Sequence, residues 1–302
     1  MAAEAIAAPP LPDWLADQLP FARALVDVGG RRMHVMSAGD GPAVLMLHGN
    51  PTWGYLWRRV VAALGNHRLR IVLPDLVGLG LSDKPRDPRL HTLDGHALWL
   101  ERLVEALGLG AFVFVGHDWG GPIGLRMLAN RPERARGLVL LNTVAGPPRP
   151  GSRPTAFHRF ANLPLLSTLA FRFLGYPQRA LHRAQGDPAS IRGDVARAYR
   201  WPLAGYRNNA APLAMARMVP TSQDHASIEP LHRCQGFVES FRGPAAIVWG
   251  ERDPVLARAL GRLSRMLPAA PVTRTSGGHF LQEEVPEAIA AAVVDVASRA
   301  FG

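Results

Sequence analysis

Residues 116–121 read Gly116-His117-Asp118-Trp119-Gly120-Gly121, and this stretch decides the fold. It follows the apolar run Ala111–Val115 and precedes a helical pattern from Pro122 to Asn130. A reactive residue set among small residues between a strand and a helix is typical of a nucleophile elbow, the sharp turn that presents a catalytic side chain to a substrate. We therefore predict a strand–turn–helix unit with Asp118 at its apex.

An aspartate at this apex changes the chemistry expected of the turn. Serine needs a base before it attacks a carbonyl carbon, whereas a carboxylate is charged at neutral pH and can displace a leaving group from a saturated carbon. The product is an alkyl ester of the enzyme, which water must then hydrolyse. A helix-capping role for Asp118 is the alternative, but capping does not explain glycines on both sides of it. The sequence favours Asp118 as a nucleophile.

Length and composition indicate one large core. The chain has 302 residues, of which 48% are hydrophobic, and such a chain can bury one core with a subdomain inserted in it. No apolar run reaches the roughly 18 residues that a membrane span needs, and residues 1–6 lack the basic region of a signal peptide. The single cysteine, Cys234, excludes an intramolecular disulfide and fits a reducing compartment. We expect a cytoplasmic protein without a membrane span.

The formal net charge of +10 is unevenly distributed. Residues 149–224 hold eleven arginines against three aspartates, and Lys84 is the only lysine in the chain. A basic patch can bind nucleic acid or an anionic membrane, but these arginines are spread singly and without interleaved aromatic residues. We predict a solvated basic subdomain that does not bind nucleic acid. This region and the apolar residues 11–21 are possible contacts in a homo-oligomer.

Apolar runs of strand length alternate with helical patterns along most of the chain, after a predicted β-hairpin over residues 22–37. The predicted strands span residues 43–47, 69–73, 111–115, 137–141, 245–249 and 271–275. The predicted helices span residues 55–64, 93–107, 122–130, 256–267 and 286–300. Continuous apolar strands separated by helices indicate a mostly parallel central sheet with helices on both faces.

The alternation stops between residues 145 and 221. A proline-rich entry leads there to short helical pieces that further prolines break, and no convincing strand pattern occurs. We predict that residues 145–221 form a helical cap, inserted in a core made of residues 1–144 and 222–302.

Three residues at predicted strand ends form a catalytic set. In an open α/β sheet, functional groups collect at the carboxyl ends of the strands. Asp253 follows the strand at 245–249, and His279 follows the strand at 271–275. The order along the chain is nucleophile, acid and histidine, as in α/β-hydrolases. We predict an α/β-hydrolase fold with Asp118, Asp253 and His279 as its catalytic residues.

The pattern also predicts a role for each partner of Asp118. His279 is the general base that activates water, and Asp253 orients its imidazole through one ring nitrogen. Other polar residues nearby are interpreted as structural: Asp75 and Asp83 in a turn region, and His48 and His117 in the loops around the site.

Asn50 and Trp119 make the prediction more specific. The corresponding residues normally present backbone N–H groups to an oxyanion, and here their side chains add an amide and an indole N–H donor. Two neutral donors beside an alkylated carboxylate form a site for a departing monoatomic anion. Asn50 as a loop-stabilising amide and Trp119 as a pocket wall are the alternatives.

The chain resembles the haloalkane dehalogenases of the α/β-hydrolase superfamily in four stretches: residues 48–52, 75–85, 116–121 and 277–284. The resemblance runs from about residue 22 to residue 301 and is weakest in the predicted cap. It implies a halogenated alkane and water as substrates, halide and alcohol as products, and neither a cofactor nor a metal. Asn50 paired with Trp119, and an acid as late as Asp253, are similar to the third subgroup of that family.

Epoxide hydrolases are the closest alternative, because they share the aspartate elbow and its histidine and acid partners. They protonate the opening oxygen with two cap tyrosines, and Tyr176, Tyr199 and Tyr206 are available. They commonly carry a bulky aromatic residue where Asn50 stands, which favours the dehalogenase. A non-catalytic protein that kept the fold is a further alternative.

Overall fold

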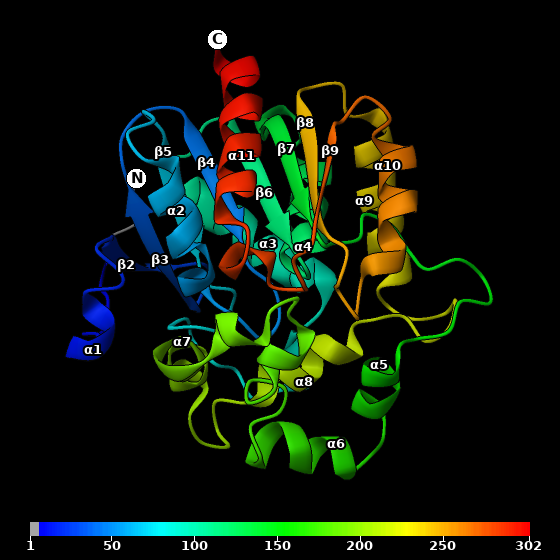
Figure 1. The fold of residues 1–302 in the computed structure, drawn as a ribbon. Coiled ribbons are helices and arrows are strands. Elements are labelled where there is room, and N and C mark those ends of the chain that lie inside the picture. The colour runs from blue at the N-terminus through cyan, green and yellow to red at the C-terminus, as the bar shows by residue number, and fades with distance from the viewer. Residues whose placement is uncertain (1–5) are drawn as a thin grey trace.

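The computed structural model describes residues 6–302, and its nine strands form a single sheet (Figure 1). The strands are β1 (Ile6–Ala7), β2 (Ala22–Asp27), β3 (Arg32–Ala38), β4 (Ala43–Leu47), β5 (Arg70–Pro74), β6 (Phe112–His117), β7 (Ala135–Leu141), β8 (Ala245–Gly250) and β9 (Val272–Thr275). Their order is β1-β2-β3-β5-β4-β6-β7-β8-β9. Strand β2 pairs antiparallel with β1 and with β3, and β3 pairs antiparallel with β5. All other neighbours in this order, including β5 and β4, are parallel. The mostly parallel α/β-hydrolase sheet is confirmed.

Helices cover both faces of the sheet, as the apolar strands require. The helices are α1 (Asp13–Ala16), α2 (Arg58–Leu64), α3 (Leu93–Ala106), α4 (Gly120–Asn130), α5 (Ala156–Ala161), α6 (Leu166–Thr168), α7 (Gly193–Arg200), α8 (Ala210–Arg217), α9 (Ile228–Ser240), α10 (Leu260–Met266) and α11 (Pro286–Phe301). Helices α2 and α11 pack together, and α4 packs between α3 and α9. Along β4, Val44 and Met46 belong to one apolar cluster while Leu45 and Leu47 belong to the other. Successive strand side chains point to opposite faces, so each face contributes its own core.

Most predicted elements form within one or two residues of their expected bounds. The helix expected at 55–64 begins as a 3-10 turn at Gly54–Trp57 and becomes α-helical in α2. The helix expected at 256–267 differs most. It begins as a 3-10 turn at Ala257–Ala259 and becomes α-helical only in α10. The reason is local: Asp253 Oδ1 accepts the backbone N–H groups of Val255 and Leu256 at 2.7 and 3.1 Å. A side-chain acceptor that satisfies these donors holds the chain in a turn and delays the helix.

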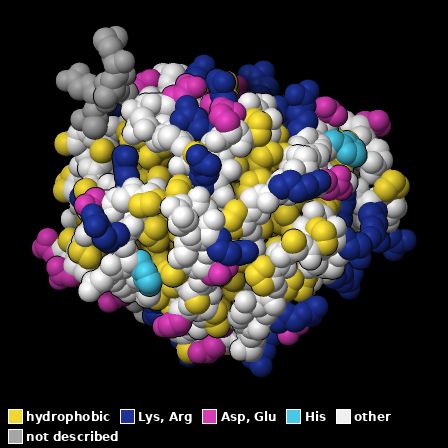
Figure 2. All heavy atoms as spheres, turned by 90° about the horizontal axis from the view of Figure 1, so that it is seen from above, with side chains coloured by type: hydrophobic (Ala, Val, Ile, Leu, Met, Phe, Trp, Pro, Cys, Tyr) yellow, Lys and Arg dark blue, Asp and Glu magenta, His cyan; other side chains and the backbone are white. Residues whose placement is uncertain are grey.

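Residues 145–221, which we call the inserted segment, join β7 to β8 and contain α5, α6, α7 and α8. All of these residues are described, and none of them lies in a strand. In Figure 1 the segment occupies the lower end of the molecule, with α6 outermost and the chain's C-terminus at the opposite end. That opposite end carries basic, acidic and apolar side chains side by side (Figure 2).

Two expectations from the sequence concern the N-terminus and membrane-spanning helices. Residues 1–5, on which the expectation of no signal peptide partly rested, lie outside the described residues. From residue 6 to residue 302, no helix is both long and apolar enough to cross a membrane.

Gly120 shows why the elbow needs glycine. A Cβ built there would overlap the backbone carbonyl oxygens of Leu47 and His48, at the end of β4. Backbone atoms in a sheet cannot rotate away as a side chain can. The first turn of α4 can therefore lie against β4 only without a side chain at residue 120.

We predict that Gly120→Ala lowers the free energy of unfolding by about 1–3 kcal/mol, the usual cost of overpacking a core. Gly236→Ala is the matched control, because Gly236 lies inside α9 with open space around its Cβ position. Alanine there should be neutral or stabilise the protein by about 0.5–1 kcal/mol. Urea unfolding of both variants measures the difference, and equal stability of Gly120→Ala and the unsubstituted protein would contradict the packing described.

Candidate active site

Asp118 occupies the turn between β6 and α4 in the left-handed region, with φ of +48°. Its backbone N–H donates to the Asn142 carbonyl oxygen at 3.2 Å. Its own carbonyl oxygen accepts the Gly121 N–H at 3.1 Å and the Thr143 hydroxyl at 2.7 Å. A non-glycine residue is strained in this conformation, and these three bonds hold it there. The strand–turn–helix unit predicted from the sequence is present.

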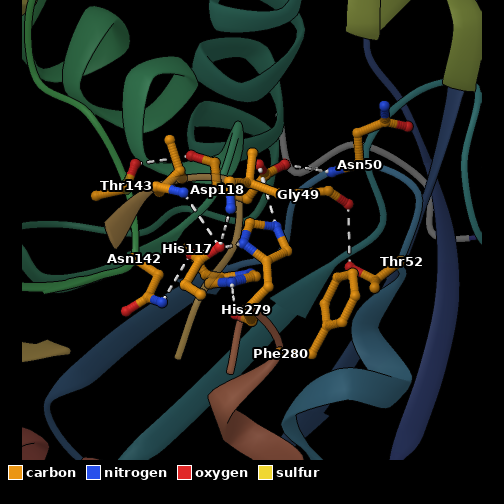
Figure 3. A network of polar contacts seen from close by, with 12 residues as sticks. Gly49, Asn50, Thr52, His117, Asp118, Asn142, Thr143, His279 and Phe280 are labelled. Carbon is orange, nitrogen blue, oxygen red and sulfur yellow. Dashed lines mark hydrogen bonds and ion pairs between the residues drawn. The ribbon is translucent and has the colours of Figure 1, made fainter. Parts of the chain in front are cut away.

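The three residues predicted as catalytic lie together in the structure, and Figure 3 shows Asp118 and His279 among them. His279, beyond the end of β9, places Nε2 3.5 Å from Asp118 Oδ2. Its Nδ1 lies 2.8 Å from Asp253 Oδ2, beyond the end of β8. Asp253 and His279 are buried, at 2% and 4% exposure. One imidazole therefore lies between two carboxylates in a site largely closed to solvent.

Burial and charge act in opposite directions on these three groups. Burial lowers the pKa of His279, but the charge of Asp253 and the hydrogen bonds to both carboxylates outweigh it and raise this pKa to about 10. Burial raises the pKa of Asp253, and the charge and hydrogen bond of His279 bring it down to about 2. The pKa of Asp118 is likewise lowered against its burial, chiefly by His279. At neutral pH the set is two carboxylates and one imidazolium.

Asn142 is a positioning residue that the sequence analysis did not assign. Its Nδ2 donates to Asp253 Oδ2 at 2.8 Å, and its Oδ1 accepts the Gly250 N–H at 2.8 Å. The side chain therefore fixes Asp253 relative to the end of β8. The place of Asn142 at a strand end was the available signal.

Asn50 contacts Asp118 through its backbone. The Asn50 N–H donates to Asp118 Oδ1 at 2.7 Å, and Figure 3 shows the Asn50 amide turned away from the carboxylate. That amide donates from Nδ2 to the Pro212 carbonyl oxygen of α8 at 3.0 Å. Its Oδ1 is buried without a partner among residues 6–302. The side chain thus links the site to the inserted segment in this conformation.

Trp119 offers a donor that is not in use. Its side chain is 7% exposed, and within the described part of the chain no hydrogen bond involves its indole N–H. Burial raises the pKa of Asp118, and the Trp119 backbone N–H helps the larger effects of His279 and His117 to lower it. Trp119, the residue next to the nucleophile in the chain, therefore combines an engaged backbone donor with a free side-chain donor.

His48 and His117 brace the loops, as the sequence analysis interpreted them. His48 Nε2 accepts the Leu76 N–H at 2.9 Å, and its Nδ1 donates to the Gly49 carbonyl oxygen at 2.8 Å. His117 Nε2 donates to the backbone carbonyl oxygen of His279 at 2.7 Å. Neither imidazole bonds to the Asp118 carboxylate. His117 thus holds the backbone of His279, and His48 holds the loop next to Asn50.

The two carboxylates interpreted as structural, Asp75 and Asp83, are engaged away from His279. Asp75 is buried and bonds to His34 Nδ1 at 2.9 Å and to the Gly54 N–H at 2.7 Å. Asp83 accepts hydrogen bonds from Arg32. These contacts make Asp75 and Asp83 structural and leave Asp253 as the carboxylate bonded to His279 Nδ1.

The three tyrosines of the inserted segment have partners away from Asp118. Tyr199 donates to Glu283 Oε1 at 2.6 Å. Tyr206 is 47% exposed and stacks on Phe173 with 5.7 Å between ring centroids. Tyr176 packs in an aromatic cluster with its ring 5.3 Å from that of Phe171. The pair of oxygen-protonating tyrosines that an epoxide hydrolase uses is not assembled in this arrangement.

His158 of α5 is a buried histidine whose pKa responds to the charge of Asp118. His158 is buried, and its Nδ1 lies 2.8 Å from the Thr155 hydroxyl oxygen. Burial lowers its pKa to about 4, while the charge of Asp118 acts against this shift. Its imidazole is therefore neutral and within electrostatic reach of Asp118. Sequence reasoning missed His158 because nothing in an irregular helical segment marks one histidine out.

No part of the described chain gathers three histidine, cysteine, aspartate or glutamate side chains that could hold a metal ion.

We predict that the His279 imidazole titrates near pH 10 and that Asp118→Asn lowers this pKa, because one of the two flanking charges is lost. The ordinary value, about 6.5, applies to the unfolded chain. The stability gained from this shift is therefore complete below about pH 6.5 and is lost as pH rises through about 10. NMR titration of the imidazole measures the shift directly. An unchanged His279 pKa in Asp118→Asn would contradict the coupling.

Comparisons with known proteins agree with this geometry. The family model described as alpha/beta hydrolase fold matches residues 42–286. A haloalkane dehalogenase of Mycobacterium marinum is 32% identical, over 88% of this chain and 90% of the relative. A cis-3-alkyl-4-alkyloxetan-2-one decarboxylase of Xanthomonas campestris pv. campestris is 33% identical, over 84% of this chain and 87% of the relative.

A solved structure extends the likeness to the whole fold. The tetrameric haloalkane dehalogenase DpaA from Paraglaciecola agarilytica NO2 superposes with a TM-score of 0.80 at 26% identity, covering 96% of this chain and 98% of its own. The sequence match, the family model and the shared architecture lead to one conclusion: the chain belongs to the haloalkane dehalogenase family of the α/β hydrolases.

Proposed function

We propose that this protein hydrolyses halogenated alkanes to alcohol, halide and a proton through an ester of Asp118. The observation that carries the proposal is the charged carboxylate of Asp118 on a strained turn, with His279 Nε2 3.5 Å from it. The dehalogenases among the relatives support the substrate class. The reaction requires substrate, water and these side chains, and it involves no cofactor.

In the first step, Asp118 displaces halide from the alkyl carbon. The Asn50 backbone N–H holds Oδ1 at 2.7 Å, which leaves Oδ2 to form the new carbon–oxygen bond as the carbon–halogen bond breaks. Negative charge moves from the carboxylate to the halide, and a neutral donor stabilises it there. Trp119 supplies this donor through its indole N–H. Asn50 would have to exchange its bond to Pro212 for one to the halide.

In the second step, water hydrolyses the ester. Alkylation removes the charge of Asp118, which is one of the causes of the raised His279 pKa. The imidazolium then releases its proton and becomes a base. Neutral His279 takes a proton from water as the water oxygen bonds to the Asp118 carboxyl carbon, and the backbone N–H groups of Asn50 and Trp119 stabilise the oxyanion. Collapse releases the alcohol, which takes its proton from His279. The Asp118 carboxyl group then gives its remaining proton to His279, and this restores the carboxylate and the imidazolium.

We expect Asp118→Asn to abolish halide release from a panel of bromoalkanes and His279→Gln to stop turnover after the first step. The second variant should accumulate the alkyl ester, visible by mass spectrometry as an alkyl group on the Asp118 peptide. Asp83→Asn is the control, since Asp83 bonds to Arg32 away from the site and should keep turnover. Halide release by Asp118→Asn at the unsubstituted rate would overturn the proposal.

A second candidate reaction follows from one relative and one contact. The decarboxylase of Xanthomonas campestris is as similar to this chain as the dehalogenases are, and the Asn50 amide is bonded to Pro212 rather than free for halide. In this reaction Asp118 attacks the saturated carbon that is bonded to the ring oxygen of a cis-dialkyl oxetan-2-one. The bond between that carbon and the ring oxygen breaks, which opens the ring and leaves a carboxylate. Loss of CO₂ would then form the carbon–carbon double bond and expel Asp118, without water.

One competition experiment distinguishes the two reactions. The protein is supplied with equal amounts of a bromoalkane and of a cis-dialkyl oxetan-2-one, and bromide and alkene are measured together. We expect bromide release to exceed alkene formation. Alkene formation alone would assign the chain to the second reaction, while His279→Gln should leave that reaction running, because it has no hydrolytic step.

Three further expectations remain proposals. We infer that residues 145–221 act as the cap over the site, supported by the bond from Asn50 to Pro212. The cytoplasm remains the proposed compartment, supported by the only cysteine, Cys234, whose thiol is buried. A homo-oligomer is possible in the light of the tetrameric DpaA structure.

A further inference from the structure

The outermost part of the inserted segment exposes apolar side chains. Leu166, Leu169 and Phe173 follow one face of α6 and the π-helical turn after it, and they are 61%, 51% and 61% exposed. A surface helix normally turns its polar side chains outward, and contiguous exposed apolar groups mark interaction sites. We call the following six residues the apolar face: Leu163, Leu165, Leu166, Leu169, Phe173 and Leu174.

The inner side of the same helix is fixed to the protein. Phe171 is fully buried, and its ring lies 6.3 Å from that of Phe160 and 5.3 Å from that of Tyr176. Ser167 is also buried and accepts a hydrogen bond from Arg217 at 3.1 Å. The helix therefore cannot rotate its leucines inward without removing Phe171 from its cluster. Exposure of the apolar face is part of the fold.

Positive charge accompanies the apolar face. The inserted segment holds eleven arginines and only two acidic residues, Asp187 and Asp194. Most of these arginines are exposed: Arg149, Arg153, Arg159, Arg179, Arg183, Arg192, Arg197, Arg200 and Arg207. Within residues 6–302 none of them forms an ion pair.

Two of these arginines lie directly beside the apolar face. Arg207 donates from Nε to the Tyr206 hydroxyl at 3.1 Å, and the Tyr206 ring stacks on Phe173. The Arg179 side chain lies against Gly175, next to Leu174. At the opposite end of the molecule, acidic side chains lie among the basic and apolar ones (Figure 2). Unneutralised positive charge and exposed leucines thus coincide at one end of the protein.

We propose that this end binds the surface of an anionic lipid bilayer, with the apolar face inserted at the level of the headgroups. An interfacial site combines leucine and phenylalanine side chains that enter the acyl boundary with arginines that contact lipid phosphates. The negative surface potential of such a membrane attracts basic segments close to it. The apolar face and the unpaired arginines supply both contributions on one surface. The proposal is independent of the reaction catalysed.

Other occupants fit these observations less well. A second copy that docked by the same face would bring two strongly basic segments together, and like charges oppose such an isologous contact. A nucleic acid would need the arginines at the centre of the surface to neutralise its phosphates. Here exposed leucines lie next to Arg179 and Arg207. An anionic bilayer matches both the apolar face and the charge beside it.

Cosedimentation with vesicles tests the proposal. We expect the protein to bind phosphatidylcholine vesicles that contain about 30 mol% phosphatidylglycerol, and to bind pure phosphatidylcholine at least about tenfold more weakly. The double variant Leu166→Ser/Phe173→Ser should weaken binding by about tenfold or more. The matched control is Leu98→Ser/Phe301→Ser, which removes a leucine and a phenylalanine exposed outside the inserted segment and should keep full binding.

Charge is tested in the same assay. Arg179→Gln/Arg207→Gln should weaken binding by about tenfold, whereas Arg68→Gln/Arg136→Gln, with the same change in net charge, should leave it nearly unchanged. Arg68 and Arg136 are exposed at the starts of β5 and β7. Raising the salt concentration from about 0.1 to about 0.5 M should weaken binding further. Thermal unfolding of every variant verifies that it is folded.

Three results would overturn the proposal. The first is no binding to the anionic vesicles. The second is an equal loss of binding in each variant and its matched control, which would mean that overall hydrophobicity or net charge is responsible. The third is self-association in sedimentation velocity that Leu166→Ser/Phe173→Ser abolishes while vesicles are not bound, which would assign the apolar face to a contact between copies of the chain.

Discussion

The left-handed turn at Asp118 is the constraint on which the site depends. A non-glycine residue at φ of +48° costs of the order of 1–3 kcal/mol. The conformation persists because β6 before Asp118 and α4 after it require a tight turn between them. Gly120 can then pack against the carbonyl oxygens at the end of β4. The same turn places the Asp118 carboxylate at the end of the sheet where Asp253 follows β8 and His279 follows β9. The backbone conformation that packing imposes at Asp118 therefore also sets the position of its carboxylate in the site.

Charge balance is the second requirement, since Asp118 must remain anionic although it is enclosed. A buried carboxylate is stable only with a charged or hydrogen-bonding partner. His279 supplies the charge to both aspartates. Asn142 donates a second hydrogen bond to the same Asp253 oxygen, Oδ2, at 2.8 Å, and the backbone N–H groups of Val255 and Leu256 satisfy Oδ1. Because the imidazolium depends on two carboxylates, the loss of either charge changes its acidity. The proposed two-step reaction uses this dependence to convert His279 from a partner of the nucleophile into a base.

The sheet and the meeting of Asp118, Asp253 and His279 could be predicted because their signals are local. The run Ala43–Leu47 has the length and apolarity of a buried strand, and parallel topology brings strand ends together whatever lies between them. The Asn50 amide could not be placed, since its partner Pro212 belongs to an irregular segment. His158 and the exposed Leu166 likewise depend on how short helices pack. No periodicity in the sequence specifies that packing, so these features emerged only from the structure.

The central claim is that oxygen reaches the product from Asp118 rather than directly from water. A single turnover of a bromoalkane in H₂¹⁸O, with enzyme in excess, tests it most directly. Displacement by Asp118 predicts an unlabelled alcohol and one ¹⁸O atom in the Asp118 carboxylate, detected in its peptide. An alcohol labelled in that first turnover, with an unlabelled Asp118 peptide, would show that water attacks the alkyl carbon and would contradict the account.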